Sequence, residues 1–114
     1  MDEPRRVRLT RPALADLAEI GDYFAQLRGL DDAEALIGDL RDHIARLDHF
    51  PLRGPVPKEL RRTGRTDVRQ TLMGRYRIFY IVNENEVAVF MITDGRRNID
   101  AVLDIRLLAP DPPA

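Results

Sequence analysis

The stretch 68–97, VRQTLMGRYRIFYIVNENEVAVFMITDGRR, decides the fold of this chain. It contains runs rich in Val, Ile, Tyr and Phe, which favour β-strands, separated by residues that favour turns. The predicted strands cover 67–73, 75–82 and 87–93, and their joints are Gly74 and the polar segment 83–86. Parallel neighbours would need a long crossover between them. These short joints therefore predict a three-stranded antiparallel meander.

An amphipathic helix is predicted well before the meander, over 10–27. Its apolar residues recur at spacings of four and three, which places them on one helical stripe. These residues are Ala13, Leu17, Ile20, Phe24 and Leu27. Thr10 can cap the first free N–H groups, and Pro12 in the first turn loses no internal hydrogen bond.

A second amphipathic helix follows after a short joint that contains Gly29. Asp31 or Asp32 is expected to cap it, and Pro51 is expected to end it. Its apolar stripe consists of Ala33, Leu36, Ile37, Leu40, Ile44 and Leu47. Two helices joined so closely form an antiparallel hairpin.

Three further segments complete the predicted domain. Residues 6–10, RVRLT, offer a fourth short strand before the first helix. Residues 51–67 carry three prolines and two glycines, which indicates a loop with at most one helical turn, at 58–62. The segment 98–108 is either a short helix capped by Asn98 or a strand, because its apolar residues alternate. The order of elements predicts one α+β domain.

Length and composition limit what this chain can be. Its 114 residues are enough for one domain with its own core. There is no cysteine and there are only two histidines, which excludes thiolate chemistry and a Cys/His zinc site. We therefore expect neither a metal nor a cofactor. No apolar run approaches the ~18 to 20 residues that cross a bilayer, and no secretory signal is visible at the start. We expect a soluble cytoplasmic protein whose residues 109–114 are disordered.

Charge is distributed unevenly along the chain, although the net charge is only −1. Residues 1–50 carry −4, residues 51–83 carry +6 and residues 84–114 carry −3. A basic block in a nearly neutral chain can attract an anionic partner. The alternative is that the block pairs with the acidic helices of the same molecule, and the sequence leaves both interpretations open.

Several phrases, taken in order, resemble the RelE/ParE family of bacterial type II toxin–antitoxin toxins. They are ALADLAEIGDYFA in the first predicted helix, FPLRG after the second, VRQTLMGRYRIFYIV in the meander and DGRR after its last strand. The resemblance covers roughly residues 5–108. It implies a compact bacterial toxin whose sheet carries the functional surface. It also implies a cognate antitoxin that wraps and neutralises the toxin, so that the two form a hetero-oligomer.

The family includes two activities that need different chemistry. ParE-like members bind and poison DNA gyrase, whereas RelE-like members cleave messenger RNA on the ribosome. The ribonuclease activity would assign catalytic, phosphate-clamping roles to Arg69 and Arg97, or to Arg96 in place of Arg97. RelE-like enzymes also carry a tyrosine or histidine in the terminal segment and a lysine pair before the first arginine. Neither feature is present here, because 98–108 holds no such residue and Lys58 is the only lysine. This departure favours a ParE-like inhibitor, and a domain of this fold without toxicity is the third interpretation.

The predicted target-binding residues are the arginines at the margins of the meander, Arg69, Arg75, Arg77, Arg96 and Arg97. The expected partners are the antitoxin and DNA gyrase, or alternatively the ribosome and messenger RNA, and no membrane. We expect an acidic region of the antitoxin to fold onto the basic block between Arg53 and Arg77.

Some of these residues have a purely structural alternative. Arg77 can pair with an acid of the helices. Tyr76 and Tyr80 lie on one strand face and are expected to be core residues rather than a stacking platform for a base. His43 and His49 lie near the end of the second helix and are expected to be structural.

Overall fold

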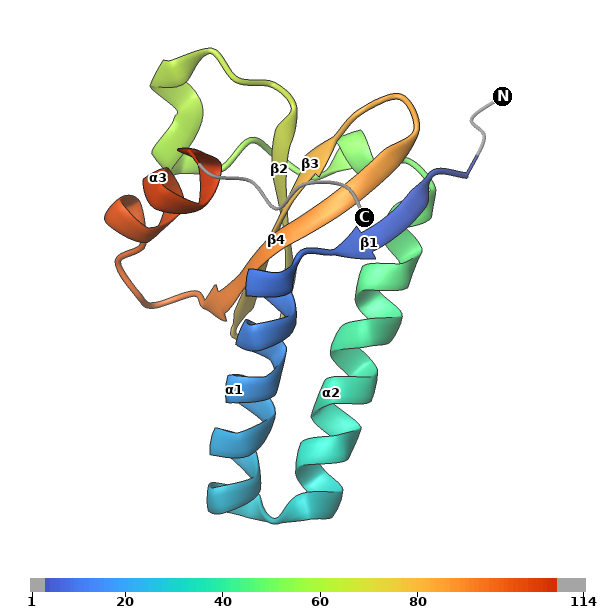
Figure 1. Cartoon of the computed structure of the whole chain (residues 1–114), viewed down its shortest axis with the longest axis vertical. Helices are drawn as coiled ribbons and strands as arrows, with labels where there is room; N and C mark the ends of the chain where they lie inside the picture. Colours follow the sequence, from blue (N-terminus) through green and yellow to red (C-terminus); the bar gives the residue numbers. More distant parts are fainter. Residues whose placement is uncertain (1–3, 109–114) are drawn as a thin grey trace.

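The computed structural model describes residues 4–108 and confirms the predicted α+β order (Figure 1). In chain order the elements are β1 (Arg6–Leu9), α1 (Arg11–Arg28), α2 (Leu30–Ala45), η1 (Arg46–Asp48), η2 (Pro51–Arg53), η3 (Lys58–Thr63), β2 (Val68–Met73), β3 (Tyr76–Val82), β4 (Glu86–Asp94) and α3 (Asp100–Leu108), where η marks a 3-10 helix. The terminal segment is thus a helix and not a strand. The tail 109–114, predicted to be disordered, lies outside the described residues. Within the described part of the chain, no helix is both long and apolar enough to span a membrane.

The four strands form a single sheet in the order β1-β4-β3-β2. The pairs β2–β3 and β3–β4 are antiparallel, as the meander predicts, and β1 lies parallel to β4 at the far edge. The edge strands are therefore β1 and β2. The connection before β2 covers part of that edge, because the Gln70 N–H donates to the Pro55 carbonyl oxygen at 3.0 Å.

Both helices of the hairpin form as predicted, but two of the predicted boundaries are wrong. The Thr10 hydroxyl accepts from the Ala13 N–H at 3.3 Å and caps α1. Gly29, at a φ of 94°, ends α1 and also begins α2. Asp31 and Asp32 therefore lie inside the first turn of α2 and do not cap it. Pro51 does not end α2, which stops at Ala45 and continues into the 3-10 turn of η1.

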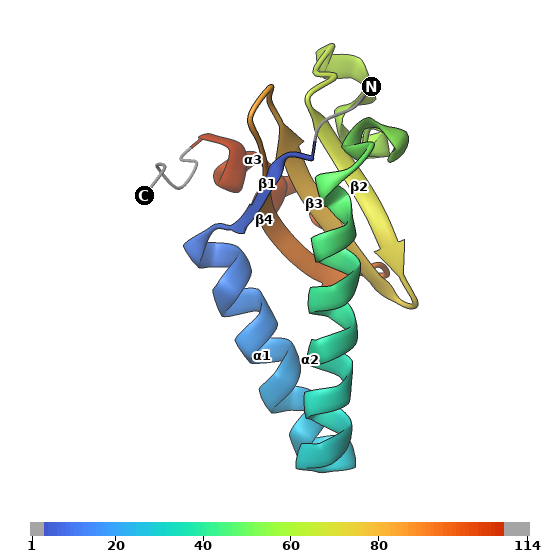
Figure 2. The same ribbon diagram turned by 90° about the vertical axis from the view of Figure 1, so that its right-hand side faces the viewer.

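The two sheet faces are covered by different elements (Figures 1 and 2). The α1–α2 hairpin packs on one face, and its far end extends well beyond the sheet. The core on this face includes Ala13, Leu17, Leu40, Ile44, Ile78, Tyr80, Val82, Val87, Val89 and Ile92. The other face packs against α3 and η3 through a second core formed by Leu60, Val68, Phe79, Phe90, Met91, Ile99 and Leu103. Tyr80 is fully buried on the hairpin face and Tyr76 packs against the same core, which confirms that both are core residues.

A β-bulge in β4 allows this strand to serve both cores. Phe79 pairs with Met91 and Tyr80 pairs with Val89, so Phe90 has no partner of its own in the ladder. Phe90 and Met91 then point to the same face, whereas the side chains of Val89 and Ile92 lie on the other. One extra residue thus reverses the alternation of β4 half-way along its length.

One carboxylate ties α1, β4 and α3 together. Asp16 on α1 accepts the backbone N–H of Ile92 at 2.9 Å, close to the bulge. Arg106 on α3 donates to both oxygens of Asp16, at 2.8 and 2.9 Å, and to the Phe90 carbonyl oxygen at 2.8 Å. These hydrogen bonds raise the pKa of Arg106. Together with the buried Leu103, the network fixes the short C-terminal helix against the sheet.

His43 provides a test of how α2 docks on the sheet. Its Nε2 lies 2.9 Å from the hydroxyl oxygen of Thr71 on β2. Burial, together with the nearby Arg46 guanidinium, lowers the pKa of His43 below its ordinary value of 6.5. The unfolded chain therefore binds a proton at a pH where the folded chain does not, and stability falls as the pH decreases through 6.5 towards the folded pKa.

The variant His43→Gln, which cannot titrate, is expected to lose less stability over this range. Urea unfolding midpoints on either side of pH 6.5 measure the difference. The prediction is contradicted if the midpoint changes equally with pH in both proteins.

Candidate target-binding surface

A groove lined by basic residues lies on the sheet face that carries α3 and η3. It is bounded by η3, the β2–β3 hairpin and the turn after β4, and its volume is about 400 Å³. Its lining residues are Pro55, Val56, Lys58, Arg61, Gln70, Leu72, Gly74, Arg75, Arg77, Gly95 and Arg96. Five of them are cations, and within residues 4–108 no acidic residue lines it. This groove, hereafter the basic groove, presents a positive potential to an anionic group.

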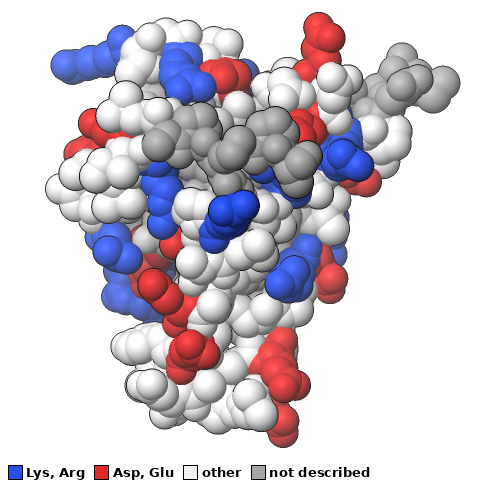
Figure 3. Space-filling model, in the orientation of Figure 1, with Lys and Arg blue, Asp and Glu red and all other residues white. Residues whose placement is uncertain are grey.

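The charge segregation seen in the sequence persists on the surface. In the view of Figure 3, the charged side chains visible near the far end of the helical hairpin are acidic, whereas the sheet half of the molecule carries basic side chains together with acidic ones. Within the described residues, no ion pair joins the block 51–83 to α1 or α2. The block therefore does not pair with the acidic helices, and the excess positive charge remains on its surface.

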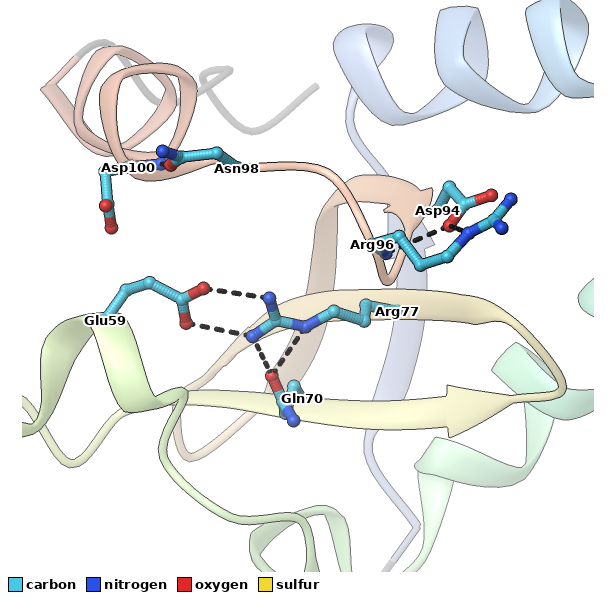
Figure 4. A network of polar contacts seen from close by, with 7 residues as sticks. All are labelled: Glu59, Gln70, Arg77, Asp94, Arg96, Asn98 and Asp100. Carbon is cyan, nitrogen blue, oxygen red and sulfur yellow. Dashed lines mark hydrogen bonds and ion pairs between the residues drawn. The ribbon is translucent and has the colours of Figure 1, made fainter.

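Arg77 is buried at the base of the basic groove and is held by other side chains of the same molecule (Figure 4). Its guanidinium donates to both carboxylate oxygens of Glu59, at 2.8 and 2.9 Å, and to the side-chain oxygen of Gln70. It also stacks 4.6 Å above the ring of Phe79. These hydrogen bonds lower the pKa of Glu59. Arg77 was predicted to contact the target, but its donors are occupied and its acid comes from η3 and not from the helices. We therefore leave it out of the proposed target surface.

The turn after β4 brings Arg75 and Arg96 to the same rim of the basic groove. The carboxylate of Asp94 accepts the Arg96 backbone N–H at 2.9 Å and the Arg75 side chain at 2.6 Å. These contacts, with a weaker one from the Arg96 side chain, lower the pKa of Asp94 to about 2. Asp94 is thus charged at all physiological pH values and holds the turn in place. The Arg96 side chain itself is 79% exposed, so it is available to a partner (Figure 4).

Arg97 is one of the residues that line a neighbouring cavity on the hairpin side. This wedge, about 490 Å³ in volume, lies between α1 and the end of the sheet. Its lining residues are Asp16, Glu19, Ile20, Tyr23, Phe24, Leu27, Arg28, Arg75, Tyr76, Ile92, Thr93, Asp94 and Arg97. Arg75 lines both the wedge and the basic groove. Arg75, Arg96 and Arg97 therefore form one cationic rim, which is mostly exposed and in which Asp94 pairs with Arg75 and Arg96.

Arg69 does not belong to this rim. Val68, Gln70 and Leu72 face the basic groove side, so Arg69 points to the hairpin side of the sheet. Its guanidinium donates to three backbone carbonyl oxygens, those of Thr66 at 2.8 Å, Leu52 at 2.7 Å and Gly54 at 3.1 Å. Arg69 also stands opposite Tyr80, whereas Asp94 stands opposite Tyr76. Four residues of strand separate the two positions by roughly 13 Å.

The family model of the ParE toxin of type II toxin–antitoxin systems, parDE, matches residues 7–99. The chain belongs to this family. Its fold is similar to the chromosomal ParDE system from P. aeruginosa, with a TM-score of 0.67 and 21% identity over 82% of this chain and 98% of that one. It is also similar to the toxin–antitoxin complex RelBE2 from Mycobacterium tuberculosis, with a TM-score of 0.59 and 19% identity over 82% of this chain and 94% of that one. No curated protein sequence matches the chain.

Among the described residues, no histidine, tyrosine or carboxylate lines the basic groove of this ParE-family toxin, and most of its cations are arginines. Its guanidinium groups remain protonated at any physiological pH and are poor general acids or bases. The histidines lie elsewhere, since His43 faces β2 from α2 and His49 pairs with Asp48 at 3.0 Å. Tyr80 points away from the groove, and burial raises the pKa of its hydroxyl.

Sequence reasoning did not identify all of the residues in this ParE-family surface. Lys58 and Arg61 line the basic groove together with Arg75. In the sequence they lie in a proline-rich loop without periodicity, so no pattern predicts which way their side chains face. The net charge of the block 51–83 was the only signal for them. Gln70 and Glu59 gave no signal at all, because their role depends on where Arg77 is buried.

Proposed function

We propose that this chain is the toxin of a type II toxin–antitoxin pair, that it inhibits bacterial growth by binding DNA gyrase in the cytoplasm, and that a cognate antitoxin neutralises it. The target surface in this proposal is the cationic rim of Arg75, Arg96 and Arg97, extended by Lys58 and Arg61 across the basic groove. An acidic region of the antitoxin is expected to cover the same cations.

The engagement of Arg69 is the observation that supports a binding toxin over a ribonuclease. A phosphate clamp needs two arginines that converge on one phosphate. Here Arg69 is occupied by three carbonyl oxygens and stands opposite Tyr80, roughly 13 Å along the strands from Asp94, after which Arg96 and Arg97 follow. The catalytic roles that the ribonuclease alternative gives to Arg69 and Arg97 therefore have no common site to act on.

The variant Arg96→Ala/Arg97→Ala is expected to lose growth inhibition while its melting temperature barely changes. Both side chains are exposed, and exposed ion pairs contribute little to stability. Asp94 keeps Arg75 and the backbone of the turn as partners in this variant. Growth after induction, gyrase supercoiling in vitro and thermal unfolding are measured on the same protein.

The matched control is Arg46→Ala/Arg62→Ala, which removes two exposed arginines that line neither the basic groove nor the wedge. This control is expected to remain toxic. If both double variants remain toxic, or if the Arg96/Arg97 variant melts far below the wild type, the rim is not the target surface.

The purified wild-type chain is expected to show no ribosome-dependent cleavage of messenger RNA, because no histidine, tyrosine or carboxylate lines the described groove. Primer extension on translated messages tests this. Cuts at defined codon positions that disappear in Arg69→Ala would establish the ribonuclease alternative. If the chain neither cleaves messages nor inhibits gyrase, it is a binding module of the same fold.

A further inference from the structure

The loop between η1 and η3 exposes two large apolar side chains in an unusual conformation. Phe50 is 54% exposed and Leu52 is 49% exposed. Phe50 has a φ of 52°, and it is the only non-glycine residue with positive φ among the described residues. A bulky aromatic residue adopts this left-handed conformation at a cost in free energy, so the surroundings must impose it.

Two side chains of the sheet, the buried Tyr80 and the half-buried Arg69, fix this loop. The Tyr80 hydroxyl donates to the Pro51 carbonyl oxygen at 2.6 Å. Arg69 donates to the carbonyl oxygens of Leu52 and Gly54 at 2.7 and 3.1 Å. The loop is therefore held by two side chains of the sheet, Tyr80 on the central strand β3 and Arg69 on the edge strand β2, and Arg69 has a structural role here. Phe50 and Leu52 are presented to solvent on a rigid support.

The exposed side of the loop has the composition of a binding hot spot. Phe50, Leu52 and Arg53, together the Phe50 patch, line a shallow cavity of about 380 Å³ with Arg5 and Pro51. The Arg53 guanidinium lies 5.0 Å from the centre of the Phe50 ring. Aromatic residues and arginine are enriched among the residues that dominate binding energy. The patch is separate from the rim of Arg75, Arg96 and Arg97. It lies near the Tyr80 end of β3, whereas the rim lies near the Tyr76 end.

We propose that the Phe50 patch is a preformed docking site for an apolar side chain of the antitoxin, carried on a segment with flanking carboxylates. This inference rests on the proposed function, since it assumes an antitoxin partner. The Arg53 guanidinium lines the cavity, and no acidic residue is among its described lining residues, which favours an acidic segment. The cavity takes one or two side chains, whereas a folded target would need about 800 Å² of its own surface to bind stably. A rigid loop also loses no conformational entropy on binding, so a flexible segment can be held tightly.

The test removes the apolar groups without removing the loop. In Phe50→Asn/Leu52→Ser, asparagine tolerates the left-handed conformation better than phenylalanine, so the melting temperature is not expected to fall. The probe is the purified product of the short reading frame adjacent to that of the toxin. Its dissociation constant is expected to rise on the order of 100-fold, because both side chains of the hot spot are lost. Inhibition of gyrase supercoiling is expected to stay at the wild-type level. The matched control, Ile105→Ser, removes an apolar side chain that is 66% exposed on α3 and is expected to bind like the wild type.

The possible results separate this inference from the proposed function. If the wild-type chain binds the probe and the double variant binds it equally well, the Phe50 patch is not the docking site, and the toxin assignment is unaffected. If the variant binds the probe normally but no longer inhibits gyrase, the patch contacts the target and the inference is overturned. If the wild-type chain itself does not bind the probe, the proposed neutralisation fails, and the inference fails with it.

Discussion

Arg77→Ala is expected to destabilise the fold by about 3 to 5 kcal/mol, because it leaves the Glu59 carboxylate without its cation in a water-poor site. The side chains of Arg77 and Glu59 are only 8% and 11% exposed, and their contact is bidentate. For a domain of this size, such a loss corresponds to a fall in melting temperature of roughly 10 to 20 °C. Thermal unfolding followed by circular dichroism measures it.

Two controls show whether the cost arises from a buried charge. Arg75→Ala removes an arginine that also pairs with a carboxylate, but 56% of its side chain is exposed, and its melting temperature is expected to change little. Replacing both members of the buried pair, as Glu59→Met/Arg77→Met, leaves no unpaired charge and is expected to recover much of the lost stability. A small effect of Arg77→Ala alone would mean that water or the Arg61 guanidinium takes the place of Arg77 beside the Glu59 carboxylate.

The same ion pair makes a prediction about pH. In the folded chain, hydrogen bonds from Arg77 lower the pKa of Glu59 below its ordinary value of 4.5. The pair therefore stabilises the fold fully above pH 4.5, and its contribution is lost as the pH falls through the folded pKa. Glu59→Met/Arg77→Met should consequently lose less stability in acid than the wild type.

Gly54→Ala is expected to cost about 3 kcal/mol or more, although the backbone of Gly54 is extended and suits any residue. A Cβ at this position would overlap the carbonyl oxygen of Gln70 and the hydroxyl of Tyr80. Neither can move freely, because Gln70 is part of β2 and Tyr80 is fully buried. The loop would have to leave the sheet and give up the Tyr80 and Arg69 hydrogen bonds to its carbonyl oxygens.

Gly38→Ala is the matched control for this prediction. Gly38 lies within α2, and an added Cβ there meets no atom within 4 Å. Alanine has a higher helix propensity, so this variant is expected to gain roughly 1 kcal/mol. Denaturant unfolding of both variants gives the two free energies. If Gly54→Ala were tolerated as well as Gly38→Ala, the loop would not be held against the sheet as described, and the Phe50 patch would lose its rigid support.

The sequence by itself determined the secondary structure, because periodicity and turn residues act over short distances. The apolar stripe of α1 and the run of β-favouring residues in β3 are local patterns, and both elements formed where they were expected. The helix boundaries could be predicted less well from the sequence. Gly29 serves both helices because its φ of 94° allows an abrupt reversal, so no separate capping residue was needed.

Only the tertiary structure decided which arginines are exposed and which are held within the molecule. Arg69, Arg75 and Arg77 all stand at margins of the same two strands and look equivalent in sequence. Pairing in the sheet sends Arg69 to one face and Arg77 to the other. Arg77 is then buried because η3 brings Glu59 against it, from 18 residues earlier in the chain. Burying a guanidinium requires a carboxylate in contact, and whether one arrives depends on how a loop without periodicity folds back onto the sheet.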